Sequence, residues 1–323
     1  MISGRVSDDL VARAAAVLRA GGVVAIPTET VYGLAADVEN AAAIARVYAI
    51  KGRPVDHPLI VHAHDVDALD GYAVITPALR TLAARFWPGP LTVVVARGPR
   101  TPLSVTGGQE TVAVRVPAHP LARAILAAFG GAVAAPSANR FGRVSPTSAG
   151  HVRADLGEAV DLIVDGGPSA IGVESTIVDL TAGVAAVLRT GAVGASELGD
   201  ALGAPVVARA DGAVRAPGTL RMHYAPSARV VLVAAAGRDD EVRRRAARGE
   251  RVALLALPDD AAAAARTLYA TLRALDAEGY DAIVATLPPD TEANAAVRDR
   301  LTRAAAPRAG PDSRPSTAND GSK

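Results

Sequence analysis

The sequence predicts an α/β protein of two domains, a mixed sheet with helices followed by a small Rossmann-like α/β unit. Two observations predict the first domain: short β-branched runs alternate with helical patterns over roughly the first 200 residues, and only some neighbouring runs are separated by a helix. A third observation predicts the second domain, since three further apolar runs alternate there with long alanine-rich helical stretches. The length of 323 residues agrees, because a domain averages roughly 100–200 residues.

End signals predict the helices of the first domain. Ser7 is expected to cap a helix that ends at Gly21-Gly22, and Asn40 is expected to cap a second helix. Thr76 precedes Pro77, and proline favours the first position of a helix. Runs rich in valine, isoleucine and leucine predict strands over residues 23–26, 59–62, 91–96, 111–116, 132–135, 161–164, 175–180 and 185–188.

A proline-punctuated segment with little periodicity separates the two domains. Beyond it, residues 229–234, 251–256 and 281–285 are expected to form a parallel sheet, and the apolar run 230–236 is expected to be a buried strand. The run Ala235-Ala236-Gly237-Arg238 does not supply the glycine fingerprint of dinucleotide sites, so no cofactor is assigned to this domain. The expected limits are residues 7–200 for the first domain, 201–227 for the linker, 228–306 for the second domain and 307–323 for a disordered tail.

Composition excludes several classes of protein. The chain has 34 basic and 33 acidic residues, a net charge of +1, which argues against a basic protein that coats nucleic acid. It has no cysteine, which excludes disulfides, zinc knuckles, iron–sulfur clusters and cysteine nucleophiles. The N-terminus lacks a signal peptide's apolar core, and no apolar run approaches the roughly 20 residues of a membrane span. We therefore expect a soluble, cytoplasmic protein.

Polar residues of the first domain gather in short loops at strand ends. Four of them are cations that can converge if these ends share an edge of the sheet: Lys51, Arg53, Arg115 and Arg189. Guanidinium groups grip phosphate or carboxylate at two points, and hydroxyls complete such a site. Since the sequence has no P-loop and no Gly-x-Ser-x-Gly elbow, the residues alone predict an α/β protein that binds polyanions.

Simpler interpretations of the same residues stay open. Arg53 and Arg189 could be surface ion partners. His62 and His64 suggest a metal site, but no third histidine or cysteine lies nearby, which favours a structural or substrate-contacting role. Glu29 and Glu174 are the acidic candidates for holding Mg²⁺ or orienting an amine. The spacing does not decide between them.

Taken in order, the loop motifs resemble those of the YrdC-like family, in the long form of threonylcarbamoyl-AMP synthase that carries an extra C-terminal domain. The matching stretches are Pro27-Thr28-Glu29-Thr30-Val31-Tyr32-Gly33-Leu34, Lys51-Gly52-Arg53-Pro54, Pro58-Leu59-Ile60-Val61-His62, Trp87-Pro88-Gly89-Pro90-Leu91-Thr92, Pro136-Ser137-Ala138-Asn139, Ser145-Pro146-Thr147, Glu174-Ser175-Thr176-Ile177-Val178-Asp179 and, in the linker, His223-Tyr224-Ala225-Pro226. The resemblance implies a YrdC-like mixed twisted sheet with helices, a small C-terminal α/β domain, and an ordered linker that reaches the active site.

The resemblance also implies a reaction that needs no covalent nucleophile. Threonine takes up bicarbonate, the resulting carbamate attacks the α-phosphorus of ATP, and pyrophosphate leaves a threonylcarbamoyl adenylate. Mg²⁺ is expected on the phosphates, with its ligands unassigned. Other enzymes then pass the threonylcarbamoyl group to the adenine beside the anticodon of certain tRNAs. Neither a membrane nor stable direct tRNA binding is expected.

Motif matching implies the site residues. Those expected around L-threonine are Thr30, His62, Arg115, Ala135 and Ser175; those expected around ATP are Arg53, His57, Thr111, Ser137, Asn139, Ser145, Arg189 and Tyr224; Lys51, Arg53 and Tyr224 are expected to be catalytic. The chain departs from the family at His57, where many relatives have asparagine, and at Asn139-Arg140-Phe141-Gly142, where short relatives often have Asn-x-Ser-Gly.

Two other functions remain open at this stage. A related domain forms a carbamoyl adenylate from carbamoyl phosphate, but such domains usually accompany zinc-finger modules, which a chain without cysteine cannot form. An RNA-binding module is the second alternative. The net charge of +1 and the few aromatic residues argue against a broad RNA-binding face.

Overall fold

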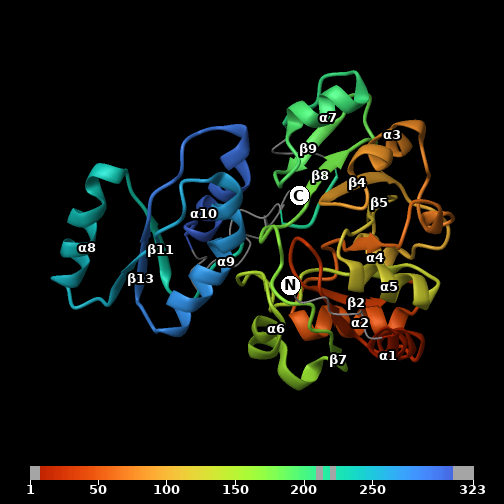
Figure 1. Cartoon of the computed structure of the whole chain (residues 1–323), viewed down its shortest axis with the longest axis horizontal. Helices are drawn as coiled ribbons and strands as arrows, with labels where there is room; N and C mark the ends of the chain where they lie inside the picture. The colour runs from red at the N-terminus through yellow and green to blue at the C-terminus, as the bar shows by residue number, and fades with distance from the viewer. Residues whose placement is uncertain (1–7, 209–213, 219–222, 308–323) are drawn as a thin grey trace, which may run out of the picture.

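A computed structural model describes residues 8–208, 214–218 and 223–307. In this part of the chain, one large sheet of ten strands has the order β10-β9-β8-β4-β5-β3-β6-β2-β1-β7 (Figure 1). Its strands are β1 (Val24–Ile26), β2 (Gly33–Asp37), β3 (Ile60–His62), β4 (Leu91–Ala96), β5 (Thr111–Arg115), β6 (Val133–Ala134), β7 (Leu162–Ile163), β8 (Thr176–Asp179), β9 (Ala186–Arg189) and β10 (Val207–Ala208). Strands β3 and β5 pair in parallel, whereas β4 and β5 pair antiparallel, so the expected mixed sheet is confirmed.

Helices cover both faces of this sheet. They are α1 (Asp8–Arg19), α2 (Ala41–Lys51), α3 (Pro77–Phe86), α4 (Leu103–Thr106), α5 (Pro120–Phe129), α6 (Ala149–Leu156) and α7 (Ala195–Leu202), with 3₁₀ turns η1 (Asp67–Leu69) and η2 (Gly157–Ala159). Two predicted caps are confirmed, because the side chain of Asn40 accepts from the backbone N–H of Ala43 and that of Thr76 from Leu79. The cap predicted at Ser7 lies outside the described residues.

Strand β1 shows how alternation divides the core between the two faces. Val24 and Ile26 pack with apolar residues of α1 and α5, while Ala25 packs on the opposite face with residues of α2. Successive side chains of a strand point to opposite faces, so one short run supports both layers.

A second sheet, also within the described residues, has three strands in the order β11-β13-β12, all parallel. Its elements are β11 (Arg229–Leu232), η3 (Ala235–Gly237), α8 (Arg238–Ala246), β12 (Val252–Leu254), α9 (Ala261–Ala277), β13 (Ala282–Ala285), η4 (Glu292–Asn294) and α10 (Ala295–Ala304). Helices α9 and α10 lie on the side that faces the large sheet, and α8 lies on the far side (Figure 1). The predicted small parallel sheet is therefore confirmed.

One apolar cluster contains residues of both domains and of the linker between them. Val173 from the loop before β8 and Tyr224 from the linker belong to the same cluster as Leu268, Tyr269 and residues of α10. Burying these side chains together stabilises the contact between the domains by the hydrophobic effect. The second domain is therefore packed onto the first and shares its interior.

Two strand predictions were wrong. Residues 27–34 were expected to form a loop, but Gly33–Asp37 forms β2, whose sequence Gly-Leu-Ala-Ala-Asp lacks the β-branched residues that predict strands. The run 230–236 was expected to be a buried strand, but β11 ends at Leu232 and only Val230 of that strand is buried. Strand β11 lies at an edge of its sheet, which leaves its side chains partly exposed.

The structure contains no helix long and apolar enough to span a membrane within the described residues.

Gly172 tests the contact between the domains. It has a φ of +83°, and a Cβ at this position would lie 2.5 Å from Cα of Arg266 and 2.6 Å from the carbonyl oxygen of Ala265, both on α9. Gly172→Ala is expected to lower the free energy of unfolding by about 3 kcal/mol, through backbone strain and the clash with α9. Urea denaturation followed by the fluorescence of Trp87 measures this loss.

The matched control is Gly249→Ala, because Gly249 has the same φ of +83° and open space around its Cβ position. It carries the strain without the clash, so a loss of about 1 kcal/mol is expected. Equal losses in the two variants would contradict close packing at Gly172.

Candidate active site

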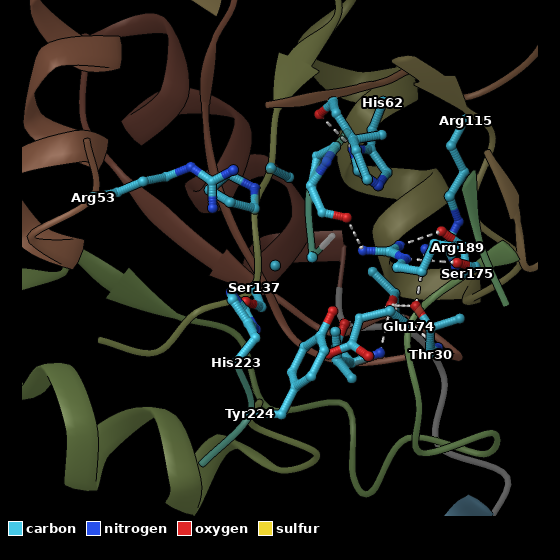
Figure 2. A pocket seen from close by; sticks show the side chains of 18 residues that line it. Thr30, Arg53, His62, Arg115, Ser137, Glu174, Ser175, Arg189, His223 and Tyr224 are labelled. Atoms are coloured by element: carbon cyan, nitrogen blue, oxygen red, sulfur yellow. Dashed lines mark hydrogen bonds between the residues drawn. The ribbon is translucent and has the colours of Figure 1, made fainter. Parts of the chain in front are cut away.

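A small, partly open cavity lies where strand ends of the large sheet meet the linker (Figure 2). It has a volume of about 50 Å³ and is lined by Thr28, Thr30, Val31, Gly33, Arg53, Ile60, His62, Arg115, Ala135, Pro136, Ser137, Glu174, Ser175, Arg189, Pro217, Gly218, His223 and Tyr224. These residues come from loops and strands far apart in the sequence, so the cavity is a product of the fold.

Strand directions explain why the cations meet. His62 and Arg115 are register partners at the carboxyl ends of the parallel strands β3 and β5. Strand β8 runs antiparallel to β5, because it is parallel to β4, and this brings Ser175 just before β8 to the same edge. Strand β9 is antiparallel to β8, so Arg189 at its end also arrives there. Of the four cations predicted to converge, Arg115 and Arg189 meet at this edge, Arg53 lines the same cavity from a loop, and Lys51 does not line it.

Arg115 defines one end of the cavity. Its guanidinium donates to the Thr30 hydroxyl at 2.9 Å, to Oε1 of Glu29 at 2.7 Å and to the Gly89 carbonyl at 3.1 Å. The residue is 4% exposed, and Oε2 of Glu29 is buried without a hydrogen-bond partner among the described residues. A buried, fixed guanidinium of this kind is suited to a planar carboxylate.

His62 lies beside Arg115 and is a neutral imidazole. Burial, together with the positive charge of Arg115, lowers the pKa of His62 to about 3. Its Nδ1 lies 3.0 Å from the carbonyl oxygen of Ile60, which can only accept, so Nδ1 carries the proton. Nε2 is then left as a hydrogen-bond acceptor, and it can accept a hydrogen bond from a hydroxyl or ammonium group of a ligand.

Arg53 and Arg189 supply the cationic part of the cavity. Arg53 is anchored by the carbonyl groups of His57 and Pro58, and burial lowers its pKa to about 10, so it stays charged at neutral pH. Arg189 donates to the backbone and hydroxyl oxygens of Ser175, each at 3.0 Å, and to the Pro217 carbonyl of the linker. Two fixed guanidinium groups in a small space make a site for an anion.

Glu174 provides a negative charge close to Arg189 and Arg300. Its Oε1 accepts from Ser145 at 2.5 Å, and its Oε2 accepts from Tyr269 and from Nε of Arg300, each at 2.8 Å. Burial by itself would raise the pKa of Glu174, but the charges of Arg300 and Arg189 outweigh burial and lower it to about 2. A carboxylate with this pKa is a poor proton acceptor at neutral pH.

The linker closes the cavity with His223 and Tyr224. Tyr224 has a φ of 62°, which is uncommon for a bulky residue, and its ring is packed edge-on against His223 and stacked near Tyr269. Its hydroxyl is buried without a partner among the described residues. A Cβ on Gly218 would lie 2.1 Å from that hydroxyl, so only glycine lets the linker approach so closely.

The structure separates the predicted site residues into two groups. Those that line the cavity are Thr30, Arg53, His62, Arg115, Ala135, Ser137, Ser175, Arg189 and Tyr224. Those that do not line it are Lys51, His57, Thr111, Asn139 and Ser145. The roles of both groups stay predictions.

The residues of the second group have other positions in the described structure, and one of them, Ser145, donates to Glu174. Lys51 donates to the carbonyls of Ser137 and Asn139 at 2.5 and 2.7 Å, and burial lowers its pKa well below the usual range. The side-chain amide of Asn139 donates to backbone carbonyls of its own loop. His57 packs edge-on against Phe141, and Thr111 begins β5. Lys51 and Asn139 therefore hold the loop that carries Ser137.

Sequence reasoning left several lining residues out of the predicted set. Glu174 was considered only as an acidic candidate, and Pro217, Gly218 and His223 were not assigned to the site. The adjoining motif Glu174-Ser175-Thr176 could have indicated Glu174, because a carboxylate directly before a predicted site serine shares its loop. The contacts from Tyr269 and Arg300 have no local sequence signal.

No group of three or more His, Asp or Glu side chains that could hold a metal ion occurs in the described parts of the chain. Glu174 is the carboxylate that lines the cavity, and both of its oxygens are already engaged by side-chain donors. The residues present therefore do not offer Mg²⁺ a cage of protein ligands. An ion held mainly by ligand phosphates and water does not need one.

Fold and site together define an α/β protein with a partly open, cation-lined cavity between a mixed sheet and a linker. Comparison with known proteins narrows this class. Residues 16–191 match the Sua5/YciO/YrdC family model, described as telomere recombination, and residues 184–306 match the model of the threonylcarbamoyl-AMP synthase C-terminal domain. The chain belongs to the threonylcarbamoyl-AMP synthase family, in its long form, whose members are adenylyl-transferring enzymes.

Individual relatives are similar in sequence to this chain over nearly its whole length. The threonylcarbamoyl-AMP synthase of Pyrococcus abyssi is 38% identical over 325 residues, which cover 93% of this chain and 95% of the relative. That of Bacillus subtilis is 38% identical over 93% of this chain and 94% of its own length. The crystal structure of P. abyssi Sua5 complexed with L-threonine superimposes with a TM-score of 0.89 at 36% identity, covering 93% of this chain and 95% of that one.

Glu174→Gln tests the charge balance of the cavity. The substitution keeps the shape of the side chain but leaves Arg300 and Arg189 buried without this counter-charge. We expect the free energy of unfolding to fall by about 3 kcal/mol, as is typical when one partner of a buried ion pair is removed. Urea denaturation at pH 7 measures the change.

Glu110→Gln is the control, because Glu110 is largely exposed and pairs with Arg97 at the surface. Its loss is expected to be below about 1 kcal/mol. A Glu174→Gln variant as stable as this control would show that the buried charge is not needed.

Proposed function

We propose that this chain makes threonylcarbamoyl-AMP and pyrophosphate from L-threonine, bicarbonate and ATP. The observation that carries the proposal is that a single cavity is lined by Arg115 and His62, which are register partners on β5 and β3, and by Arg53 and Arg189. Such a cavity suits an amino acid carboxylate next to a polyphosphate. The membership of the chain in the threonylcarbamoyl-AMP synthase family and the L-threonine complex of P. abyssi Sua5 support the choice of threonine.

Threonine fits the end of the cavity that holds Arg115. The guanidinium would bind its carboxylate, and Nε2 of His62 would accept a hydrogen bond from its hydroxyl or amine. The amine then combines with bicarbonate to give a carbamate and water. Holding the carbamate in place turns its attack on the nucleotide into an effectively unimolecular step.

ATP fits the cationic side. A carbamate oxygen attacks the α-phosphorus, the bond to the bridging oxygen breaks, and pyrophosphate leaves with that oxygen. Arg53 and Arg189 would neutralise the charge that develops on the phosphate oxygens, which is the main contribution a protein makes to such transfers. Mg²⁺ would arrive with the phosphates of ATP and supply further neutralisation. The product would pass to separate cytoplasmic enzymes that modify the adenine beside the anticodon of tRNA.

The linker would act as a lid. The cavity of about 50 Å³ is much smaller than the roughly 300–1,000 Å³ of typical ligand pockets, and His223 and Tyr224 line it, so the linker would have to shift before ATP and threonine could bind. A linker that retreats for entry and returns over the product would keep water from a mixed anhydride.

A product assay tests the proposed reaction. Purified protein is incubated with ATP, Mg²⁺, threonine and labelled bicarbonate, and the mixture is analysed at once by mass spectrometry. A labelled threonylcarbamoyl adenylate that requires threonine is expected, and Arg115→Ala should reduce kcat/KM for threonine by about 100-fold or more, since a charge-assisted two-point contact is lost. An adenylate that forms from carbamoyl phosphate without threonine would contradict the proposal.

Tyr224→Ala tests the lid. Removing the ring opens the cavity and takes away a hydroxyl that is free to meet the nucleotide. We expect weaker ATP binding by calorimetry and faster loss of the adenylate to hydrolysis. The control is Tyr280→Ala, because the Tyr280 ring lies beside Arg251 in the second domain. Unchanged ATP affinity together with unchanged adenylate yield would rule out the lid.

A further inference from the structure

The second domain reaches the cavity through Arg300. This residue lies on α10 and is 1% exposed. Its Nε donates to Glu174 at 2.8 Å, its Nη2 to the Thr190 carbonyl at 3.0 Å and its Nη1 to Asp299 at 2.6 Å. The guanidinium carbon also lies 4.9 Å from the centre of the Tyr224 ring.

These contacts connect Arg300 to three parts of the site. Glu174 lines the cavity, Thr190 directly follows Arg189, and Tyr224 belongs to the linker. We propose that Arg300 is a positioning residue for the reaction, which holds Glu174, the end of β9 and the Tyr224 ring in place, so that the second domain is part of the active site. The inference rests on the proposed function.

The placement of Arg300 argues for this role. A buried guanidinium is costly, and an apolar side chain would fill the interior between the domains at lower cost. All three guanidinium nitrogens of Arg300 nevertheless donate hydrogen bonds, and two of the acceptors, Glu174 and the Thr190 carbonyl, lie in the active-site region of the other domain. A residue that only joined the two domains would not need to contact both Glu174 and the residue that follows Arg189.

Tyr269 on α9 supports the same carboxylate from the second domain. Its hydroxyl donates to Oε2 of Glu174 at 2.8 Å, and its ring is stacked near Tyr224 with centroids 5.9 Å apart. Tyr269 is fully buried. The second domain therefore fixes Glu174 with a charged and a neutral donor, which sets the orientation of the carboxylate as well as its charge.

Arg300→Met tests the proposal, with Arg298→Met as the matched control. Arg298 lies on the same helix and pairs with Asp290 and the Pro288 carbonyl, away from the cavity. We expect kcat/KM for ATP to fall on the order of 10- to 100-fold in Arg300→Met, the range seen when the partner that orients a site ligand is lost. Arg298→Met should keep wild-type kinetics. Equal kinetics in Arg300→Met and wild type would overturn the proposal.

A double-mutant cycle separates positioning from general destabilisation. If Arg300 acts through Glu174, the Glu174→Gln and Arg300→Met double variant should be little slower than the slower single variant. If the two losses multiply, the residues act independently and the proposal is wrong. Circular dichroism and urea denaturation establish that each variant is folded at the assay temperature.

The pH profile gives a second independent readout. The groups that face Glu174 are Arg300 from α10, Tyr269 from α9, Arg189 from β9, Ser145 from the loop before α6, and His223 and Tyr224 from the linker. Burial raises the pKa of Glu174 and Arg300 lowers it, so Arg300→Met should raise the pKa. Glu174 then loses its charge at a higher pH, and the acid limb of kcat/KM should move to higher pH. An acid limb that does not move would contradict positioning through Glu174.

The outcomes distinguish this inference from the proposed function. A wild-type protein that makes no adenylate refutes the proposed function. In that case the inference about Arg300 is tested by ATP affinity, measured by calorimetry, instead of by kinetics. Weaker ATP binding in Arg300→Met than in wild type is expected, and equal binding would contradict the inference. If Arg300→Met does not fold, Tyr269→Phe takes its place, because it removes a single hydroxyl. A several-fold loss of kcat/KM supports the inference and an unchanged value overturns it.

Discussion

The buried carboxylate of Glu174 is the charge on which the geometry of the cavity depends. Arg189 and Arg300 are both buried within the protein, and taking each guanidinium out of water costs several kcal/mol unless a counter-charge lies close. Glu174 supplies that charge and binds Arg300 directly, while the field of Arg189 helps to keep it ionised. Because its hydrogen-bond partners come from both the first and the second domain, this one carboxylate helps to fix how the two domains meet.

Linker and cavity depend on each other through close contacts. Gly218 passes so near the Tyr224 hydroxyl that no side chain fits, and Arg189 holds the Pro217 carbonyl. Tyr224 stays in a left-handed backbone conformation because its ring is packed between His223, Tyr269 and Arg300. A ligand that replaces the linker contact of Arg189 would weaken this closure, so occupancy of the anion site and the position of the linker are coupled in our account.

Much of the fold followed from local patterns, because β-branched runs and helix caps act over a few residues. Strand β2 was missed because its alanines carry no strand preference. The length and burial of β11 were overestimated because its position at the edge of a sheet is decided by pairing with distant residues. Arg115 and Arg189 could be predicted as members of one group of cations because strand ends carry them, whereas His62 was assigned to the site by motif matching. Glu174 could be identified only as a candidate, since its partners Tyr269 and Arg300 lie more than 90 residues away. The contacts of Lys51 with the carbonyl groups of Ser137 and Asn139 could not be predicted either, because these residues lie more than 80 positions away along the chain.

A structure of the protein with L-threonine and a non-hydrolysable ATP analogue would test the central claim most directly. Our account predicts the threonine carboxylate on Arg115, the triphosphate beside Arg53 and Arg189, and the linker at Pro217, Gly218, His223 and Tyr224 displaced from its present place. Glu174 should keep its contact with Arg300 in that complex. A nucleotide bound outside this cavity, or bound within it while the linker contacts stay unchanged, would contradict the account.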